Sequence, residues 1–392
     1  MDTQNTQVHI RLWHREFWLM AIACWLLSMS VYSLIPVMPL WLIHTENFST
    51  TDVGWAMGVF GVGIFFFGAM CSFLVQHFRR NIVCIYAVAG VTLSIACLWY
   101  VDSLKVQFVE FWVILVERFA LGAAYGLAQM VLTSTLIIDT CESFQRTEAN
   151  YSAAWFARFA LSLGPLAGLL LYEQFGFSTI LVFAASCSML SMILIKMVSF
   201  PFRTPEETVH LISLDRFLLP SGMVLFVNLM LSTAVIGMIF SLPLRWMFYA
   251  MMMTGFFFAL LAQRYVFAEA ELKSEVVSGL ILIIAAVIMM LTRTQAIVSY
   301  VTPLFIGFAI GIIGSRFLLF FIKLSHHCQR GTSQSMFMLS WETGIALGLF
   351  MGYTLFQCDK SNLLRTALVC SAISLVMYVT YTHNWFLKHK NR

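Results

Sequence analysis

Residues 145–168 read QRTEANYSAAWFARFALSLGPLAG, and a diverged second copy of this stretch lies 184 positions further along the chain. Both copies begin with a Gln-Arg pair, Gln145-Arg146 in the first and Gln329-Arg330 in the second. Both then carry small or apolar residues at matching offsets: Ala160 with Gly344, Leu163 with Leu347, Gly164 with Gly348, and Gly168 with Gly352. The repeat predicts a chain built from two related halves.

Two charged residues occupy corresponding positions in the two copies. Arg158 and Glu342 each follow the arginine of the Gln-Arg pair by twelve residues, inside apolar sequence. On helices with the same rise of 1.5 Å per residue, equal offsets give equal depth and the same facing direction within each half. We therefore expect a base and an acid to face a central cavity at similar depth, related by a pseudo-twofold axis.

The composition is typical of an integral membrane protein. Of the 392 residues, 60% are hydrophobic and 11% are charged, whereas a soluble domain carries about 25% charged residues. A helix that crosses a bilayer needs roughly 17–25 mostly apolar residues. We predict an all-α fold with twelve transmembrane helices, over residues 17–43, 53–75, 81–101, 111–138, 150–172, 177–195, 217–242, 246–262, 276–291, 296–322, 335–356 and 366–381.

The longest polar interruption falls in mid-chain and divides the predicted spans six and six. We predict an N-terminal six-helix bundle over residues 1–200, a cytoplasmic linker over 201–216 and a C-terminal six-helix bundle over 217–392. Two halves of six helices keep the same orientation in the membrane, as parallel repeats do.

The basic residues predict the orientation. With the N-terminus in the cytoplasm, fifteen of the 23 Lys and Arg residues fall on the cytoplasmic side and five on the outer side. Cytoplasmic loops carry such an excess of Lys and Arg. We therefore expect a multi-pass protein of the inner (cytoplasmic) membrane with both termini in the cytoplasm.

Several other classes of function are disfavoured. The basic residues behind the net charge of +4 are spread over short loops and form no nucleic-acid-binding face. The nine cysteines include no CxxC pair, so we expect no metal site and no cofactor. The absence of a Walker motif disfavours ATP hydrolysis, and the short loops leave no room for a soluble catalytic domain. We expect a monomer in the lipid bilayer that is not an enzyme.

Two motifs resemble those of the major facilitator superfamily. The fourth span carries Arg118-Phe-Ala-Leu-Gly122-Ala-Ala, similar to the family's motif in that helix. The fifth span carries Ala160-Leu-Ser-Leu-Gly164-Pro165-Leu-Ala-Gly168, similar to the antiporter motif of the family's exporters. The resemblance covers nearly the whole chain. It implies two pseudo-symmetric bundles around a central cavity, alternating access by rocking, and an ion gradient, of protons, as the driving force.

The family's loop motif between the second and third spans is altered. The segment Ser72-Phe-Leu-Val-Gln76-His-Phe-Arg79-Arg80 keeps the basic end but has Gln76 where the family has an acid. Because the acid is missing, the charge-relay gating that the family assigns to this loop does not carry over directly.

Charges inside the spans are costly. A charge in mid-membrane costs at least ~2.5–3.5 kcal/mol, so it normally faces a cavity or a partner. Glu117 precedes Arg118, but consecutive residues of a helix point about 100° apart, and we expect that they do not face each other. The resemblance implies that Arg118 faces the cavity and assists proton coupling; the alternative is a structural ion pair between helices.

Glu342 has two candidate partners. Arg316 lies at a comparable depth in the tenth span, and Arg158 lies across the pseudo-twofold axis. Burial and a neighbouring cation act in opposite directions on a carboxyl group's affinity for protons. Either pairing could therefore be exchanged during transport and tune Glu342 as a proton site; the alternative is a permanent salt bridge.

Small and aromatic residues complete the candidate set. Close helix packing is the usual role of small residues repeated every fourth position, and proline permits a bend. Packing and hinge roles are therefore predicted for Gly122, Gly164, Pro165, Gly168, Gly344, Gly348 and Gly352. Four side chains are candidates for the lining of a substrate cavity: Tyr125, Trp155, Asn228 and Trp341.

The predicted function is secondary active transport of a small organic molecule by alternating access, with proton-coupled export. Three buried arginines against two buried glutamates favour an anionic or zwitterionic substrate. A lipid or lysolipid flippase of the same fold is an alternative. From another class, a membrane-embedded transferase or a non-transporting sensor is also open, although a transferase needs an acid or histidine cluster near a membrane face, which the sequence does not show.

Overall fold

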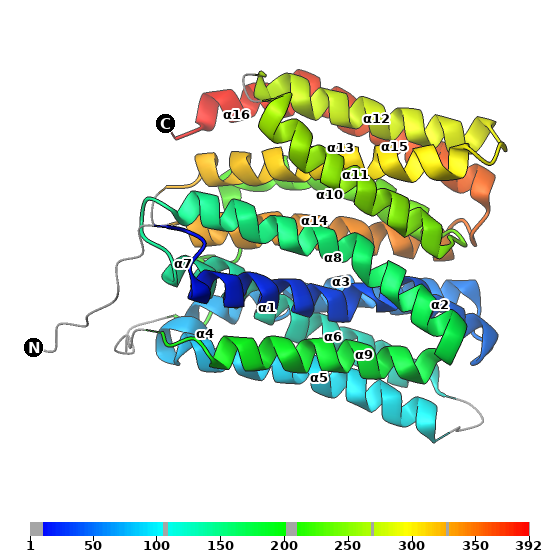
Figure 1. The fold of residues 1–392 in the computed structure, drawn as a ribbon, viewed down its shortest axis with the longest axis horizontal. Coiled ribbons are helices and arrows are strands. Elements are labelled where there is room, and N and C mark those ends of the chain that lie inside the picture. Colours follow the sequence, from blue (N-terminus) through cyan, green and yellow to red (C-terminus); the bar gives the residue numbers. More distant parts are fainter. Residues whose placement is uncertain (1–10, 105–108, 201–209, 268–269, 327–328, 392) are drawn as a thin grey trace, which may run out of the picture.

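The computed structural model describes residues 11–104, 109–200, 210–267, 270–326 and 329–391. In this part of the chain the regular structure is helical. The long helices run side by side along one direction, and α1 begins at the same end of the molecule at which α16 ends (Figure 1). We call this the terminal end and the opposite one the far end. The predicted linker falls partly on residues 201–209, which lie outside the described residues.

The helices before the linker are α1 (Arg15–Tyr32), α2 (Leu34–His44), α3 (Thr50–Phe65), η1 (Gly68–Met70), α4 (Cys71–His77), α5 (Arg80–Ser103), α6 (Phe111–Val131), the π-helical turn η2 (Leu132–Leu136), α7 (Ile137–Asp139), α8 (Arg146–Phe175) and α9 (Phe177–Lys196). Those after it are η3 (Pro220–Gly222), α10 (Met223–Phe240), α11 (Trp246–Tyr265), α12 (Leu272–Thr292), α13 (Val298–Leu324), α14 (Arg330–Thr354), α15 (Lys360–Met377), the π-helical turn η5 (Tyr378–Thr382) and α16 (His383–His389).

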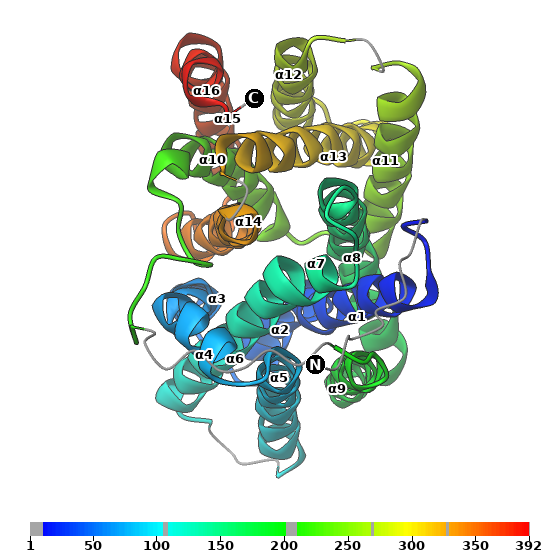
Figure 2. The same ribbon diagram turned by 90° about the vertical axis from the view of Figure 1, so that its left-hand side faces the viewer.

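Eleven stretches of the described chain are long and apolar enough to cross a membrane. The predicted span 335–356 corresponds to α14, a helix of 25 residues that is not among the eleven. Its polar residues account for this: Thr332, Ser333, Gln334, Ser335, Ser340, Glu342 and Thr343. They are tolerated because α14 packs between α10 and α3, at mid-height in Figure 2, and most of its residues are buried.

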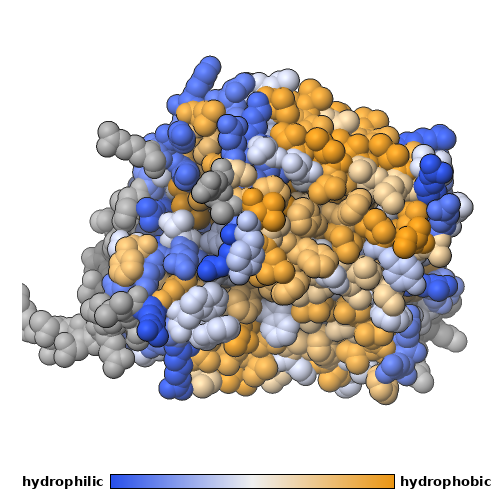
Figure 3. Space-filling view, turned by 45° about the horizontal axis from the view of Figure 1, so that its top comes forward, coloured by the Kyte–Doolittle hydropathy of each residue, from blue (hydrophilic) through white to orange (hydrophobic). Residues whose placement is uncertain are grey.

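The surface explains why the chain is so apolar. A broad hydrophobic band separates hydrophilic residues at the two ends of the molecule (Figure 3). Large apolar side chains are exposed across the described chain, among them Tyr86, Leu93, Val116, Ile193, Ile281 and Val376. A contiguous apolar surface of this extent is not compatible with water but matches a bilayer.

The helices before and after the linker occupy the lower and upper parts of the view along the helices (Figure 2). Two pairs of helices make the larger contacts between these groups, α3 with α14 and α8 with α11. Along the first pair, Gly54 and Gly58 lie against Phe350, so α3 and α14 are in close contact towards the far end.

The first span is interrupted at Ser33, between α1 and α2. Pro36 has no N–H for the carbonyl of Tyr32, four residues earlier, and its ring crowds that carbonyl, which breaks the helix there. Helix α8 packs against the break: a Cβ on Gly164 would lie 2.9 Å from the Cβ of Tyr32, and one on Gly168 would collide with the carbonyl of Ser33. The Gly-Pro stretch of α8 therefore fixes the position of Tyr32.

Three glycines in the second half of α14 face α10. A Cβ on Gly344 would collide with Thr233, one on Gly348 with the carbonyl of Ala234, and one on Gly352 with Ser241. In the first half, a Cβ on Gly122 would collide with the carbonyl of Phe60 in α3. These positions let helix backbones approach closely, as small residues do in membrane helices.

Candidate functional site

The site is organised around the carboxyl group of Glu342, which is buried in the middle of α14. The phenol of Tyr32, in α1, donates a hydrogen bond to Glu342 Oε1, and the phenol of Tyr125, in α6, donates to the same oxygen at 3.3 Å. The donors come from the first half of the chain and the acceptor from the second. Among the described residues, no Lys, Arg or His nitrogen lies within 4.0 Å of this carboxylate.

A polar chain extends from Tyr125 into the first half. The amide of Gln129 donates to the Tyr125 hydroxyl at 3.3 Å and to Ser28 Oγ at 2.9 Å. All of these side chains are buried, and a buried polar group that loses its hydrogen bond is costly. The chain therefore holds the two phenols in a defined position relative to Glu342.

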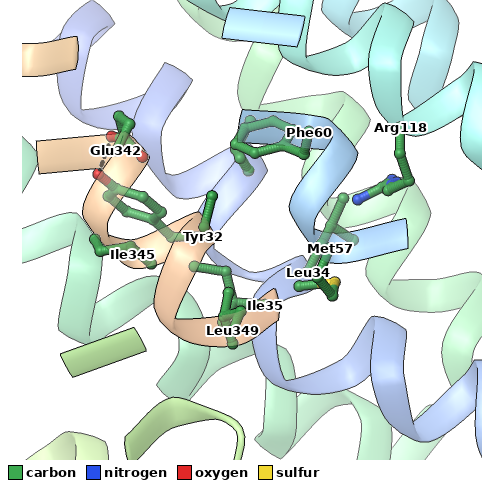
Figure 4. A pocket seen from close by; sticks show the side chains of 11 residues that line it. Tyr32, Leu34, Ile35, Met57, Phe60, Arg118, Glu342, Ile345 and Leu349 are labelled. Atoms are coloured by element: carbon green, nitrogen blue, oxygen red, sulfur yellow. Dashed lines mark hydrogen bonds between the residues drawn. The ribbon is translucent and has the colours of Figure 1, made fainter. Parts of the chain in front are cut away.

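Two small cavities adjoin Glu342. One, of about 30 Å³, lies between α1, α2, α3, α6 and α14, with Tyr32, Met57, Phe60 and Arg118 in its wall. Figure 4 shows Glu342 beside the Tyr32 ring and Arg118 on the far side of this pocket, beyond Met57 and Phe60. The other, of about 40 Å³, is lined by Ser28, Tyr125, Gln129, Arg158, Trp341 and Glu342 among others. Cavities of this size hold no more than a few water molecules.

Arg158 lines the same cavity as Glu342 but forms no ion pair with it. Its Nη1 donates to Ser315 Oγ of α13 at 2.7 Å, and its Cζ lies 4.8 Å from the centre of the Trp155 ring. The Nε and Nη2 atoms are buried and have no hydrogen-bond partner. The repeat thus brings the base and the acid to one cavity, where they lie more than a salt-bridge distance apart.

The expectation that Glu117 and Arg118 do not face each other was wrong. Arg118 Nε lies 2.6 Å from Glu117 Oε2, and Nη2 donates to Oε1 at 3.1 Å. Both residues are buried. Their Cβ atoms diverge around the helix, but the two side chains are long enough to curl together, and in apolar surroundings an unpaired charge costs more than the bent rotamers.

The expected pairing of Glu342 with Arg316 was also wrong. Arg316 Nε lies 2.6 Å from Glu275 Oε2, and Glu275 is fully buried at the start of α12. Helix α13 packs along α12, so its arginine reaches the acid of that neighbour. Sequence reasoning missed Glu275 because it immediately precedes the predicted span 276–291 and was not counted among the membrane charges.

We expect the Glu275–Arg316 pair to stabilise the second half without taking part in transport. Glu275→Ala leaves a half-buried cation unpaired, and breaking a buried pair in this way costs about 3–5 kcal/mol of folding free energy. Thermal unfolding of the purified protein should show a lower Tm for Glu275→Ala and recovery in Glu275→Ala/Arg316→Met. A double variant as unstable as the single one would contradict this explanation.

The remaining candidate residues separate into two groups. Tyr125 and Trp341 line the cavity with Glu342, and Trp155 lies against Arg158, its Nε1 buried without a partner. Asn228, by contrast, donates from α10 to the Ser374 carbonyl of α15 at 3.0 Å. It joins two helices of the second half and was wrongly assigned to the cavity. Tyr32 and Gln129 were missed, although both are polar residues inside predicted spans.

The loop after α4 forms part of a polar cluster at the terminal end. Arg80 forms an ion pair with Asp139 of α7, whereas Arg79 is exposed and Gln76 is half-buried. Sequence reasoning found no acidic partner for this loop because Asp139 lies two helices further along the chain.

The segment before α10 closes this end. Asp215 accepts hydrogen bonds from Ser72 at 3.3 Å and from Thr332 at 3.0 Å, and Arg216 Nη1 donates to Thr135 at 2.9 Å. A Cβ on Gly331 would lie 2.8 Å from the Ser134 carbonyl. Groups from both halves of the chain therefore meet here as well as along α3 and α14.

Several solved structures are similar to this fold. An auto-inhibited peptide transporter of the POT family superposes with a TM-score of 0.68 at 11% identity, over 97% of this chain and 98% of that one. The human organic anion transporter MFSD10 (TETRAN) gives 0.65 at 14% identity, over 92% and 98%. A bacterial homologue of the iron transporter ferroportin, in its outward-facing state, gives 0.65 at 13% identity, over 94% and 100%. At identities this low, the superpositions show that these proteins share a fold with this chain.

No curated protein sequence matches the chain. The family model of the Major Facilitator Superfamily matches residues 20–349, which is most of the chain and includes the first copy of the Gln-Arg stretch and most of the second. The helical fold, the apolar band and the buried charges between the halves agree with this match. The chain is a membrane transporter that belongs to the Major Facilitator Superfamily.

Proposed function

We propose that the protein is a secondary active transporter that couples the movement of protons to the export of a small organic molecule. In this proposal α14 is also a transmembrane helix, which brings their number to twelve, and residues 1–200 and 217–392 form two bundles joined by 201–216. Both termini lie in the cytoplasm of a cell whose inner membrane holds the protein, as the excess of Lys and Arg on that side favours. The protein acts as a monomer.

The observation that carries the proposal is the position of Glu342. Its carboxyl group belongs to the second half, its hydrogen-bond donors Tyr32 and Tyr125 belong to the first, and small cavities reach it from two sides. An ionised carboxylate accepts stronger hydrogen bonds than a neutral one. Protonation therefore weakens the link between the halves and shifts the population towards a state in which they separate.

Arg158 supports an anionic or zwitterionic substrate. Within the described chain, the arginines of two buried pairs are neutralised by Glu117 and Glu275, whereas Arg158 is buried with two nitrogens unpartnered. An unpaired buried cation in a cavity is a ready site for an anionic group. A carboxylate or phosphate of the substrate would satisfy these nitrogens in a bidentate arrangement.

The cavities at Glu342 are too small for an organic substrate, so the structure corresponds to a closed conformation. Close contacts at α3 and α14 towards the far end, and the polar cluster at the terminal end, account for the closure. Alternating access requires each set of contacts to open in turn while the other stays closed.

A lipid or lysolipid flippase of the same fold is the second candidate. An apolar groove of about 430 Å³ lies between α3 and α14, and its wall includes the exposed side chains of Trp55, Val62 and Leu347. Ala346 lines both this groove and the cavity beside Glu342. An acyl chain could enter this groove from the bilayer.

Proteoliposomes loaded with a pH-sensitive dye test both candidates. We expect substrate-dependent proton movement with a member of a panel of organic anions, amino acids, nucleosides and dipeptides. Labelling of Cys358, which precedes α15 at the far end, with a membrane-impermeant maleimide establishes the orientation in the vesicles. Selective movement of a fluorescent lysophospholipid instead would favour the flippase. If no panel member moves protons and no lipid is translocated faster than in empty vesicles, the protein is not a transporter of either kind.

A further inference from the structure

A polar cavity of about 240 Å³ lies at the terminal end, distinct from the cavities at Glu342. It is formed by the starts of α5, α8 and α14, by the turn η2 with α7, and by the segment before α10. Its charged lining residues are Arg80, Asp139, Arg146, Asp215, Arg216 and Arg330. Residues from both halves of the chain therefore surround one space.

The cavity has a surplus of positive charge. Four arginines and two aspartates line it, which leaves two cations in excess. Asp139 forms an ion pair with Arg80, and Asp215 Oδ2 lies 3.8 Å from Arg216 Nε. In the part of the chain that the structure describes, Arg146 and Arg330 have no carboxylate within 4.0 Å. The surplus thus comes from the arginines of the repeated Gln-Arg pairs.

The backbone adds to this positive field. Helix α8 begins at Arg146 and α14 at Arg330, and neither helix has a side-chain hydrogen bond at its cap. The first N–H groups of a helix lack intrahelical partners and carry a partial positive charge, which favours anions. Gly331 lets the first turn of α14 approach Ser134.

Arg146 Nε is buried and has no hydrogen-bond partner, which is costly unless a ligand supplies an acceptor. Glu148, in the first turn of α8, is exposed and does not line the cavity.

We propose that this cavity binds a phosphate group, from a soluble phosphate or from the head group of an anionic phospholipid, and that the bound anion holds the terminal end closed. Arginine matches phosphate oxygens with two parallel hydrogen bonds, and a phosphate between Arg146 and Arg330 would contact both halves at once. Because these arginines separate when this end opens, the anion binds the closed state more tightly and shifts the population towards it. This site is independent of the proton-coupled export proposed above.

Binding of radiolabelled inorganic phosphate to the purified protein tests the soluble source, with chloride at equal ionic strength as the competing anion. Nanodiscs of phosphatidylcholine with and without phosphatidylglycerol test the lipid source, with the Tm of the protein as the readout. The test variant is Arg146→Gln/Arg330→Gln. Its matched control is Arg264→Gln/Arg293→Gln, which removes two exposed arginines that do not line the cavity. Arg146→Lys/Arg330→Lys keeps the charge but not the bidentate geometry.

We expect saturable phosphate binding, or a rise in Tm with phosphatidylglycerol, for the wild-type protein and for the control. The test variant should lose about tenfold or more in affinity, because the charge-assisted hydrogen bonds of both arginines are lost. The lysine variant should fall between the two. The proposal is overturned if the wild-type protein binds phosphate no more tightly than chloride and its Tm does not rise with phosphatidylglycerol. It is equally overturned if the wild-type and test variants respond alike. The first comparison needs no variant and so does not depend on the variants' folding.

Discussion

Glu342→Gln is expected to abolish proton-driven accumulation of the substrate while the protein still exchanges substrate down its gradient. Glutamine has the shape of the protonated carboxyl group and can still accept hydrogen bonds from Tyr32 and Tyr125. It cannot gain or lose a proton, so the link between the halves no longer depends on pH. Coupling free energies between sites are typically 1–3 kcal/mol, and losing one changes accumulation by about 5–150-fold.

Two measurements in proteoliposomes test this expectation. The rate of substrate exchange should vary with pH for the wild-type protein and be independent of pH for Glu342→Gln, because the titrating group is absent. Glu148→Gln removes the same charge from an exposed position in α8 and should behave as the wild type. Uphill transport at the wild-type level in Glu342→Gln would exclude Glu342 as the coupling group.

Much of the fold could be predicted from hydrophobic length alone. Eleven of the predicted spans correspond to helices that qualify as membrane-crossing, because a bilayer demands long apolar helices whatever their neighbours are. The remaining predicted span, 335–356 (α14), shows the limit of this argument. It is enclosed by other helices, so it does not have to satisfy lipid and can carry Gln334 and Glu342. The hydropathy of α14 therefore does not reveal where this helix packs in the fold.

The site was predicted in part, for a related reason. The repeat relates Arg158 and Glu342 by register, and in the structure both residues line one cavity. Register does not give the distance between helices or the path of a long side chain. The expectation that Glu117 does not face Arg118 was therefore wrong, and so was the candidate pairing of Arg316 with Glu342. The donors to Glu342 were missed because the position of Tyr32 depends on the break at Ser33 and its packing against Gly164 and Gly168.

Removing both charges of the Glu117–Arg118 pair is expected to leave the protein folded and to reduce transport about tenfold or more. The pair is buried, and Arg118 lines the cavity that also reaches Glu342. Arg118→Ala alone leaves Glu117 uncompensated in apolar surroundings, which costs about 3–5 kcal/mol and confounds loss of transport with loss of folding. In Glu117→Gln/Arg118→Gln no buried charge is left unpaired, so the Tm should return close to the wild-type value.

The double variant distinguishes the two roles that the sequence left open for Arg118. If the pair only stabilises the fold, Glu117→Gln/Arg118→Gln should transport as the wild type does, because the two neutral amides can still form a hydrogen bond with each other. If the cation acts on the cavity, its field at Glu342 is lost with it. Transport then stays low although the Tm recovers, because low-dielectric surroundings screen a charge poorly. Glu275→Ala/Arg316→Met is the matched control, because it removes the other buried pair at a position away from the Glu342 cavities. Equal transport in both double variants would assign Arg118 to the structure and not to the mechanism.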